Sequence, residues 1–254
     1  EKVEFASIES LCSISFNGYY SNPLELAPHL YINGQEVTNL IIPNGVTRIG
    51  DGAFCGCEAL TSIKIPDSVT TIGEEAFSGC WELANINVSG GNANYVSIDG
   101  VMYDKEKKTI IRCPQTKTSI EIPNSVTRIG ENAFFGCHAL TSITIPNSVT
   151  EIGKHAFSGC NALTSIEIPD SVTTIGEFAF DGCEALTSIE IPNSVTSIGR
   201  HAFDGCKALT SIEIPDSVTE IGDDAFDGCS ALTSINIPDS VTEIGEEAFE
   251  GCEA

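Results

Sequence analysis

Basic residues are scarce in this chain: 12 Lys and Arg stand against 36 Asp and Glu, which gives a formal net charge of −24 over 254 residues. Nucleic acids and anionic lipid surfaces are bound by clustered cations, so we expect neither as a partner. The imbalance is uneven, because residues 1–116 carry 14 acidic and 7 basic side chains (net −7) and residues 117–254 carry 22 and 5 (net −17). The second half of the chain therefore makes most of the acidic field.

Long apolar runs and catalytic motifs are also missing. No stretch of about 18 apolar residues could span a bilayer, and Glu1 does not open a secretory leader, although a processed or trimmed chain would lack one too. H-E-x-x-H, G-x-S-x-G, P-loop and dinucleotide-binding motifs do not occur. We expect no membrane insertion, no cofactor and no enzymatic activity.

The sequence has no C-x-x-C pair, although it contains eleven cysteines. Eight of them recur at a single position of a repeat: Cys57, Cys80, Cys137, Cys160, Cys183, Cys206, Cys229 and Cys252. Stacked repeats would place them in one column, about 5 Å apart, pointing the same way. That arrangement does not easily reach the disulfide dihedral of about 90°, so we expect buried free thiols and no metal site.

A 23-residue repeat dominates what is present. The string L-T-S-I-x-I-P-x-S-V-T-x-I-G-x-x-A-F-x-G-C-x-A opens, with small changes, at Leu140, Leu163, Leu186, Leu209 and Leu232. Val37 and Leu60 keep the spacing, whereas the unit at Leu83 is 11 residues longer, so the next unit starts at Lys117. We expect residues 1–36 to form a divergent repeat or cap, and residues 37–254 to form a solenoid of nine units with a hairpin insertion near 89–114. Because repeats stack on their neighbours, we expect one continuous domain.

Each unit reads as one coil of a solenoid. In the unit 163–185 the first six residues alternate and are β-branched, which predicts a strand that Pro169 ends. A second short extended stretch leads to Gly176, and E-F-A-F-D-G-C then fits one helical turn closed by glycine. Positions 1, 4, 6, 10, 13, 18 and 21 of the unit face inward. The prediction is an α/β repeat solenoid, a curved arc with a parallel sheet on its inner face and short strands, turns or single helical turns outside.

The string A-F-x-G-C-x-x-L-x-x-I-x-I-P, complete at 156–169, resembles the BspA-like (Treponema pallidum type) leucine-rich repeat family, and the resemblance covers 37–254. The segment 95–114 and the N-terminal I-E-S-L-C-S-I-S-F also look like parts of that family. Such proteins are typically surface or secreted products of host-associated bacteria and some protists. The resemblance implies an extracellular or cell-surface binding module for a protein or glycan, with adhesion to host matrix or other cells, and it brings no catalytic residues.

One exposed position, the fifth of each unit, varies between repeats that are otherwise closely copied. We call these residues the strand-face column, and they are Ile41, Lys64, Asn87, Glu121, Thr144, Glu167, Glu190, Glu213 and Asn236. Its three consecutive glutamates should repel one another as strand neighbours. Screening by water and salt, weak Ca²⁺ binding and a basic partner surface all remain open.

The insertion carries the basic residues Lys105, Lys107, Lys108 and Arg112, and Asp99-Gly100 predicts a two-residue hairpin loop. These cations either bind a partner or protect an exposed strand edge. Aromatic residues at polar positions or in the insertion are further candidate anchors: Trp81, Tyr95, Phe135 and Phe178, with Tyr19 and Tyr20 as weaker ones. His155 and His201 share position 16, two units apart, and are expected to face solvent.

Two functional classes compete. A binding module explains the variable strand-face column, whereas a structural spacer or stalk that displays other domains would not need it. The last unit, 232–254, is as regular as the interior ones and has no polar closing unit, so we expect a longer parent protein, or end-to-end contacts that cover this coil.

Overall fold

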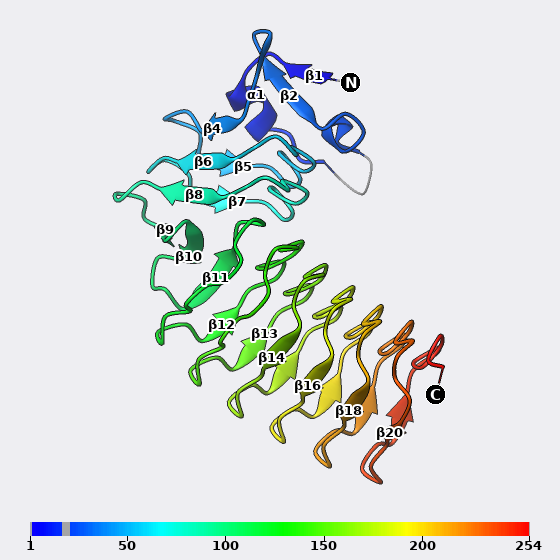
Figure 1. Ribbon diagram of the computed structural model, residues 1–254. Helices are drawn as coiled ribbons and strands as arrows, with labels where there is room; N and C mark the ends of the chain where they lie inside the picture. Colours follow the sequence, from blue (N-terminus) through cyan, green and yellow to red (C-terminus); the bar gives the residue numbers. More distant parts are fainter. Residues whose placement is uncertain (1, 17–20, 254) are drawn as a thin grey trace. The chain divides into compact units, whose positions relative to one another are not determined.

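The computed structural model describes residues 2–16 and 21–253, so Tyr19 and Tyr20 lie outside the described residues (Figure 1). The chain divides into two compact units. The first comprises Glu1–Glu106 with Pro114–Thr116, and the second comprises Lys107–Cys113 with Lys117–Ala254. Among the described residues, no helix has the length and apolar character needed to cross a membrane.

The first unit contains one small mixed sheet, two small parallel sheets and a hairpin. A short helix α1 (Ile8–Cys12), a 3-10 turn η1 (Pro23–Glu25) and a sheet of β1 (Lys2–Phe5), β2 (His29–Ile32) and β3 (Gln35–Glu36) precede the coils. The coils form two parallel ladders, one of β4 (Asn39–Ile41), β6 (Ser62–Ile65) and β8 (Asn85–Val88), the other of β5 (Arg48–Ile49) and β7 (Thr71–Ile72). The hairpin pairs β9 (Tyr95–Ile98) with β10 (Val101–Asp104).

The second unit is a stack of coils with two parallel sheets along it, and it confirms the predicted repeat solenoid (Figure 1). One sheet contains β11 (Thr109–Arg112), β12 (Arg128–Ile129), β13 (Glu151–Ile152), β15 (Thr174–Ile175), β17 (Ser197–Ile198), β19 (Glu220–Ile221) and β21 (Glu243–Ile244). The other contains β14 (Ser165–Glu167), β16 (Ser188–Glu190), β18 (Ser211–Glu213) and β20 (Ile235–Asn236). From β12 onward every pair is matched residue for residue at a spacing of 23, such as Ile166 with Ile189, whereas β11 pairs with β12 at a spacing of 19.

The core is built from columns of identical side chains, as the periodicity predicts. In the coil 163–185 these are Leu163, Ile166, Ile168, Val172, Ile175, Phe180 and Cys183, all buried. Burying each large side chain is worth roughly 1.5–3 kcal/mol, and a single coil has no second layer to supply that burial. Stability therefore comes from contacts between successive coils.

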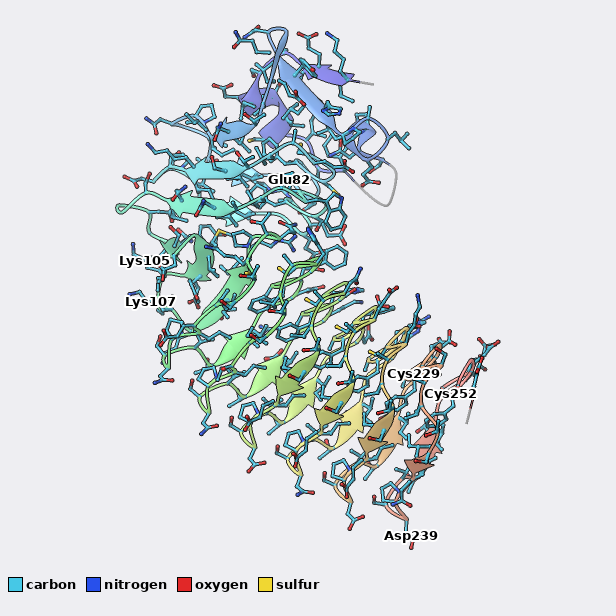
Figure 2. All side chains as sticks on the ribbon, in the orientation of Figure 1. Glu82, Lys105, Lys107, Cys229, Asp239 and Cys252 are labelled. Atoms are coloured by element: carbon cyan, nitrogen blue, oxygen red, sulfur yellow. The ribbon has the colours of Figure 1, made fainter. Side chains whose placement is uncertain are left out.

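Two of these columns, the phenylalanines and the cysteines, also make specific contacts between successive coils. Phe157 and Phe180 stack with centroids 5.3 Å apart and ring planes 2° from parallel, and the same stacking continues through Phe203 and Phe226. The cysteine thiols donate to the phenylalanine carbonyl oxygen of the preceding coil, for example Cys183 Sγ to Phe157 O at 3.3 Å. Figure 2 shows Cys229 and Cys252 on successive coils. None of the eleven cysteines, all of which lie within the described residues, forms a disulfide.

The segment expected to form a helical turn consists of turns instead. Alternate amides in it donate to the next coil, such as Phe157 N to Ala179 O at 2.8 Å, and the others close turns within the coil, such as Cys160 N to Phe157 O at 3.1 Å. An amide that bonds the neighbouring coil is not available for a helical bond, so a helix cannot form here. The residue at position 16 also has a positive φ, as at His155 (51°), which is outside helical geometry.

Candidate functional site

The strand-face column is continuous within each unit. In the first unit Ile41, Lys64 and Asn87 pair in register across β4, β6 and β8. In the second unit Glu121, Thr144 and Glu167 are joined by parallel bridges, and the column continues in register through Glu190, Glu213 and Asn236. All nine side chains are exposed, while most of the aliphatic side chains on either side of position 5 are buried, with Ile237 in the last coil exposed.

Three consecutive carboxylates give the column its charge. Glu167, Glu190 and Glu213 lie directly opposite one another in adjacent strands, about 4.8 Å apart at the usual strand spacing. No ion pair joins any of the three to a cation among the residues that the structure describes. Like charges in this arrangement repel. The column is thus a surface on which a cation or a basic ligand would relieve repulsion.

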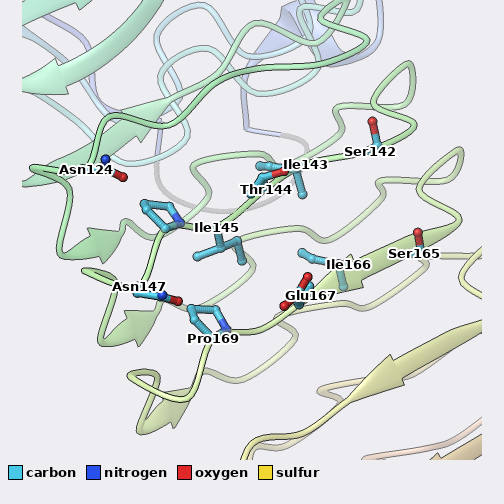
Figure 3. Close-up of a pocket in the computed structure, with 11 residues that line it drawn as sticks. Asn124, Ser142, Ile143, Thr144, Ile145, Asn147, Ser165, Ile166, Glu167 and Pro169 are labelled. Atoms are coloured by element: carbon cyan, nitrogen blue, oxygen red, sulfur yellow. The ribbon is translucent and has the colours of Figure 1, made fainter.

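A hollow of about 540 Å³ opens on this face of the second unit (Figure 3). Thr144 and Glu167 belong to neighbouring coils within it, Asn124 and Asn147 lie toward one end, and buried isoleucines form its floor. It coincides with the stretch where pairing between coils is reduced to single bridges. The hollow therefore presents amide, hydroxyl and carboxylate groups over an apolar base.

Sequence reasoning identified only part of this hollow. It named Thr144 and Glu167, but not Asn124, Asn147, Ser142 or Ser165, which also line it. These four occupy positions 3 and 8 of their units, where Ser and Asn are repeated and so attract no notice. These residues lie beside the strand-face column on the same stretch of strand and turn, and this proximity in the sequence could have identified them.

The insertion forms the hairpin of β9 and β10 within the first unit. Asp99 (φ 49°) and Gly100 (φ 81°) make its two-residue loop, and both have the positive φ that a type I′ turn requires. Tyr95 is partly buried, accepts from Ile72 N at 3.2 Å and donates to Thr70 O at 3.5 Å. Burial raises the pKa of Tyr95. Its hydroxyl thus ties the hairpin to a coil rather than standing free as an anchor.

The basic residues of the insertion do not form one exposed set. Arg112 is buried, and its Nη1 donates to Asn132 O at 2.7 Å, which corrects the expectation that it adds to a basic surface. Lys105 belongs to the first unit and donates to Asn92 O, while the exposed Lys107 and Lys108 belong to the second. Trp81, by contrast, is 37% exposed.

A second cluster, which the sequence did not reveal, lies on the turns of the second unit. Phe178 is sandwiched between the imidazoles of His155 and His201, at centroid distances of 4.5 and 4.4 Å and interplanar angles of 19° and 18°. Phe135 meets His155 edge-on at 6.3 Å. The expectation that the two histidines face solvent is wrong, because each stacks on Phe178 and is partly buried. We call His155, Phe178 and His201 the turn stack.

Charged groups surround the turn stack, and burial shifts the pKa of Asp181 and of His155. Burial raises the pKa of Asp181, opposed by a hydrogen bond from Ser158. Burial, followed by the neighbouring Lys154, lowers the pKa of His155. Within residues 2–16 and 21–253 no three His, Cys, Asp or Glu side chains converge to hold a metal ion.

The sequence was compared with known protein families. A model described as the BspA type leucine rich repeat region matches residues 25–117, 107–207 and 173–254, in six copies. No curated protein matches the chain.

The similar solved structures are also leucine-rich repeat proteins. A leucine-rich repeat protein from Eubacterium ventriosum is 30% identical with a TM-score of 0.74, over 89% of this chain and 66% of that one. A leucine rich cell surface protein from Faecalibacterium prausnitzii is 35% identical with a TM-score of 0.58, over 85% and 58%. A leucine-rich repeat protein from Bacteroides ovatus is 32% identical with a TM-score of 0.55, over 85% and 50%. The chain thus spans between half and two thirds of the length of these proteins.

Proposed function

Because the chain belongs to the BspA-type leucine-rich repeat family, we propose that it is a non-catalytic binding module, displayed at a cell surface or secreted, that adheres to a protein or glycan through its strand face. The observation that carries this proposal is the strand-face column. Its residues are of five types, Ile, Lys, Asn, Glu and Thr, while positions 4 and 6 beside them are isoleucine in nearly every coil. A spacer that only holds other domains apart needs no such variable exposed row.

The second unit offers the more developed surface for a ligand. Its column passes through the hollow at Thr144 and Glu167 and continues to Glu190 and Glu213, so shape and charge are combined on one face of the unit. Polar groups over an apolar floor are typical of sites that fix a ligand's orientation. The acidic row favours a ligand that presents basic groups.

Surface display rests on the family and on one relative. The similar structure from Faecalibacterium prausnitzii is described as a cell surface protein, at 35% identity to this chain. Adhesion would follow from surface display combined with a binding face.

A binding screen tests the proposal. The intact chain is passed over arrays of extracellular-matrix proteins and of glycans, and each hit is remeasured with Thr144→Arg, which fills the hollow. Thr174→Arg is the matched control, because it places the same side chain at an exposed position of the other sheet. We expect Thr144→Arg to weaken binding at least tenfold, a loss of about 1.4 kcal/mol, with no effect of Thr174→Arg. Hits that respond equally to both variants would refute the strand face as the site, and a chain that binds nothing would favour the spacer.

A further inference from the structure

His201 bridges two successive coils of the second unit through both of its ring nitrogens. Nδ1 lies 3.0 Å from Asp204 Oδ2 in the same turn, and Nε2 lies 3.2 Å from Asp224 Oδ2 in the next coil. The three side chains are only 17%, 28% and 18% exposed. This is an ion-paired bridge at the turn edge, distinct from the strand face.

The bridge depends on the number of protons that the ring carries. A neutral imidazole has one N–H and one lone pair, whereas a carboxylate only accepts hydrogen bonds. Both contacts are therefore hydrogen bonds only when both nitrogens are protonated. With one proton lost, a nitrogen lone pair would face a carboxylate oxygen at about 3 Å, and that contact would become repulsive.

The ring has little freedom to turn away from these carboxylates. One face of it stacks on Phe178 at 4.4 Å, and the His201 backbone has a φ of 50°, which holds the side chain on the turn edge. The backbone bonds His201 N to Asp223 O (2.9 Å) and Phe203 N to Ala225 O (2.9 Å) join the same two coils beside the bridge.

Charged or titratable groups near His201 come from its own coil and from three others. The preceding coil contributes Asp181, and the coil before that contributes His155, both of which interact electrostatically with His201. Arg200 from the same turn lies 5.9 Å from the Phe178 ring. Beside Asp224, the next coil adds Asp227, which faces Asp204. Carboxylates therefore outnumber cations around the bridge.

We propose that His201 is a proton-dependent clamp between coils 186–208 and 209–231, closed when the imidazole carries both protons and open when it loses one. The contact that opens is the one to Asp224, because Asp204 lies in the same turn as His201 and moves with it. Coupling between the two coils is therefore stronger when the ring carries both protons than when it carries one.

Protonation of Asp204 at low pH weakens the clamp. Burial raises the pKa of Asp204, against the opposing effect of its hydrogen bond from His201. As pH falls through that raised pKa, Asp204 loses its charge and the clamp loses one partner. The coupling between these coils is thus weakened when Asp204 is protonated as well as when the ring is neutral, a dependence that a purely apolar coil interface would not show.

Amide hydrogen exchange of the intact chain tests the clamp, since it reports local opening. Protection factors, corrected for intrinsic exchange, are measured for residues 199–206 and 222–228 at pH 6 and pH 8.5. We expect protection about fivefold higher at pH 6, the ratio for one partly screened ion pair. In His201→Gln the ratio should fall to one, and in Asp224→Asn to less than half of its wild-type value.

His155→Gln is the matched control, because it changes the same position of the unit and the other face of Phe178. His155 Nδ1 has no hydrogen-bond partner, so this variant should keep the pH dependence of the wild type. Nitrogen-15 NMR of the His201 ring gives a second readout, with both nitrogens protonated at pH 6. A ratio unchanged by His201→Gln, or a His201 ring that is neutral at pH 6 in the folded chain, would overturn the proposal.

Discussion

A Cβ atom on Gly176 would lie 2.7 Å from the carbonyl carbon of Gly153, its counterpart in the preceding coil. The two backbones approach so closely because Gly176 N donates to Ile152 O at 2.9 Å, at the corner that follows β15. The same close approach recurs one coil later, where a Cβ on Gly199 would meet the Gly176 backbone at 3.0 Å. Glycine at position 14 is therefore required by contact between coils rather than by its own φ.

Gly176→Ala should destabilise the second unit by about 1–3 kcal/mol, the usual cost of forcing a methyl group into packed backbone. Denaturant unfolding followed by circular dichroism measures this cost. Gly90→Ala is the control, because a Cβ there meets nothing within 4 Å. Equal stability of the two variants would show that the coils separate at no cost.

Phe180→Ala should cost about 3–5 kcal/mol, since the ring is fully buried and stacked on Phe157 and Phe203. The same change at Phe249 should cost less, because that ring is only partly buried and stacks on Phe226 alone among the described residues. Thermal and denaturant unfolding of both variants compares the two sites. A larger loss at Phe249 would contradict a core that gains its stability from coils on both sides.

The eleven cysteines should all be recovered as thiols when the protein is denatured without reductant. In the native protein most should react slowly with an alkylating reagent, because burial raises the pKa of the thiols, to about 12 for Cys229, and the thiolate is the reactive form. Cys55 and Cys252, which are less buried, should react first. Mass spectrometry of labelled peptides gives the order, and recovery of only one or two thiols would show that disulfides form.

Glu190→Gln should raise stability by about 0.2–1 kcal/mol in low salt, because Glu190 has a glutamate directly opposite on each side. Glu213→Gln should gain less, since one of its two neighbours is Asn236. Both gains should vanish in about 1 M NaCl, where the screening length is roughly 3 Å. Melting temperatures at the two salt concentrations decide this, and a gain that persists in high salt would exclude repulsion as its cause.

Millimolar Ca²⁺ should raise the melting temperature no more than NaCl of equal ionic strength. Ca²⁺ takes six to eight oxygen ligands, and no three acidic side chains converge in the described part of the chain. Differential scanning fluorimetry of the intact protein compares the two salts. A rise specific to Ca²⁺ would reveal a cation site on the acidic column, since a ligand selective for the folded state stabilises it.

The 23-residue period predicted much of what the structure contains. Leu163, Ile166 and Phe180 are buried as their positions require, and the strand-face column from Glu167 to Asn236 is in register because these coils have the same length. Asp99-Gly100 makes a hairpin loop because both residues tolerate positive φ. These features follow from local chemistry repeated at a constant spacing, so the sequence is sufficient to find them.

Other features could not be read from the chain, because they depend on which atoms of different coils meet. The turns at positions 15–21 share their amides with the next coil, so a pattern that suits a helical turn gives no helix. Arg112 is buried and its guanidinium donates to Asn132 O, although the lysines near it in the sequence suggest that it belongs to an exposed basic cluster. The hollow appears where coil pairing is reduced to single bridges, which no residue type signals.

By itself, then, the sequence determined the repeat, the inward columns and the exposed row at position 5, because each of these depends only on side-chain polarity and a fixed spacing. The tertiary structure alone decided the turn stack and the bridge from His201 to Asp204 and Asp224. A positive φ at position 16 turns three side chains along the coil edge, and stacking then brings residues 23 apart to about 4.5 Å. The directions of side chains on irregular turns are set by backbone angles and by contacts with neighbouring coils. The order of residues in the sequence specifies neither of these.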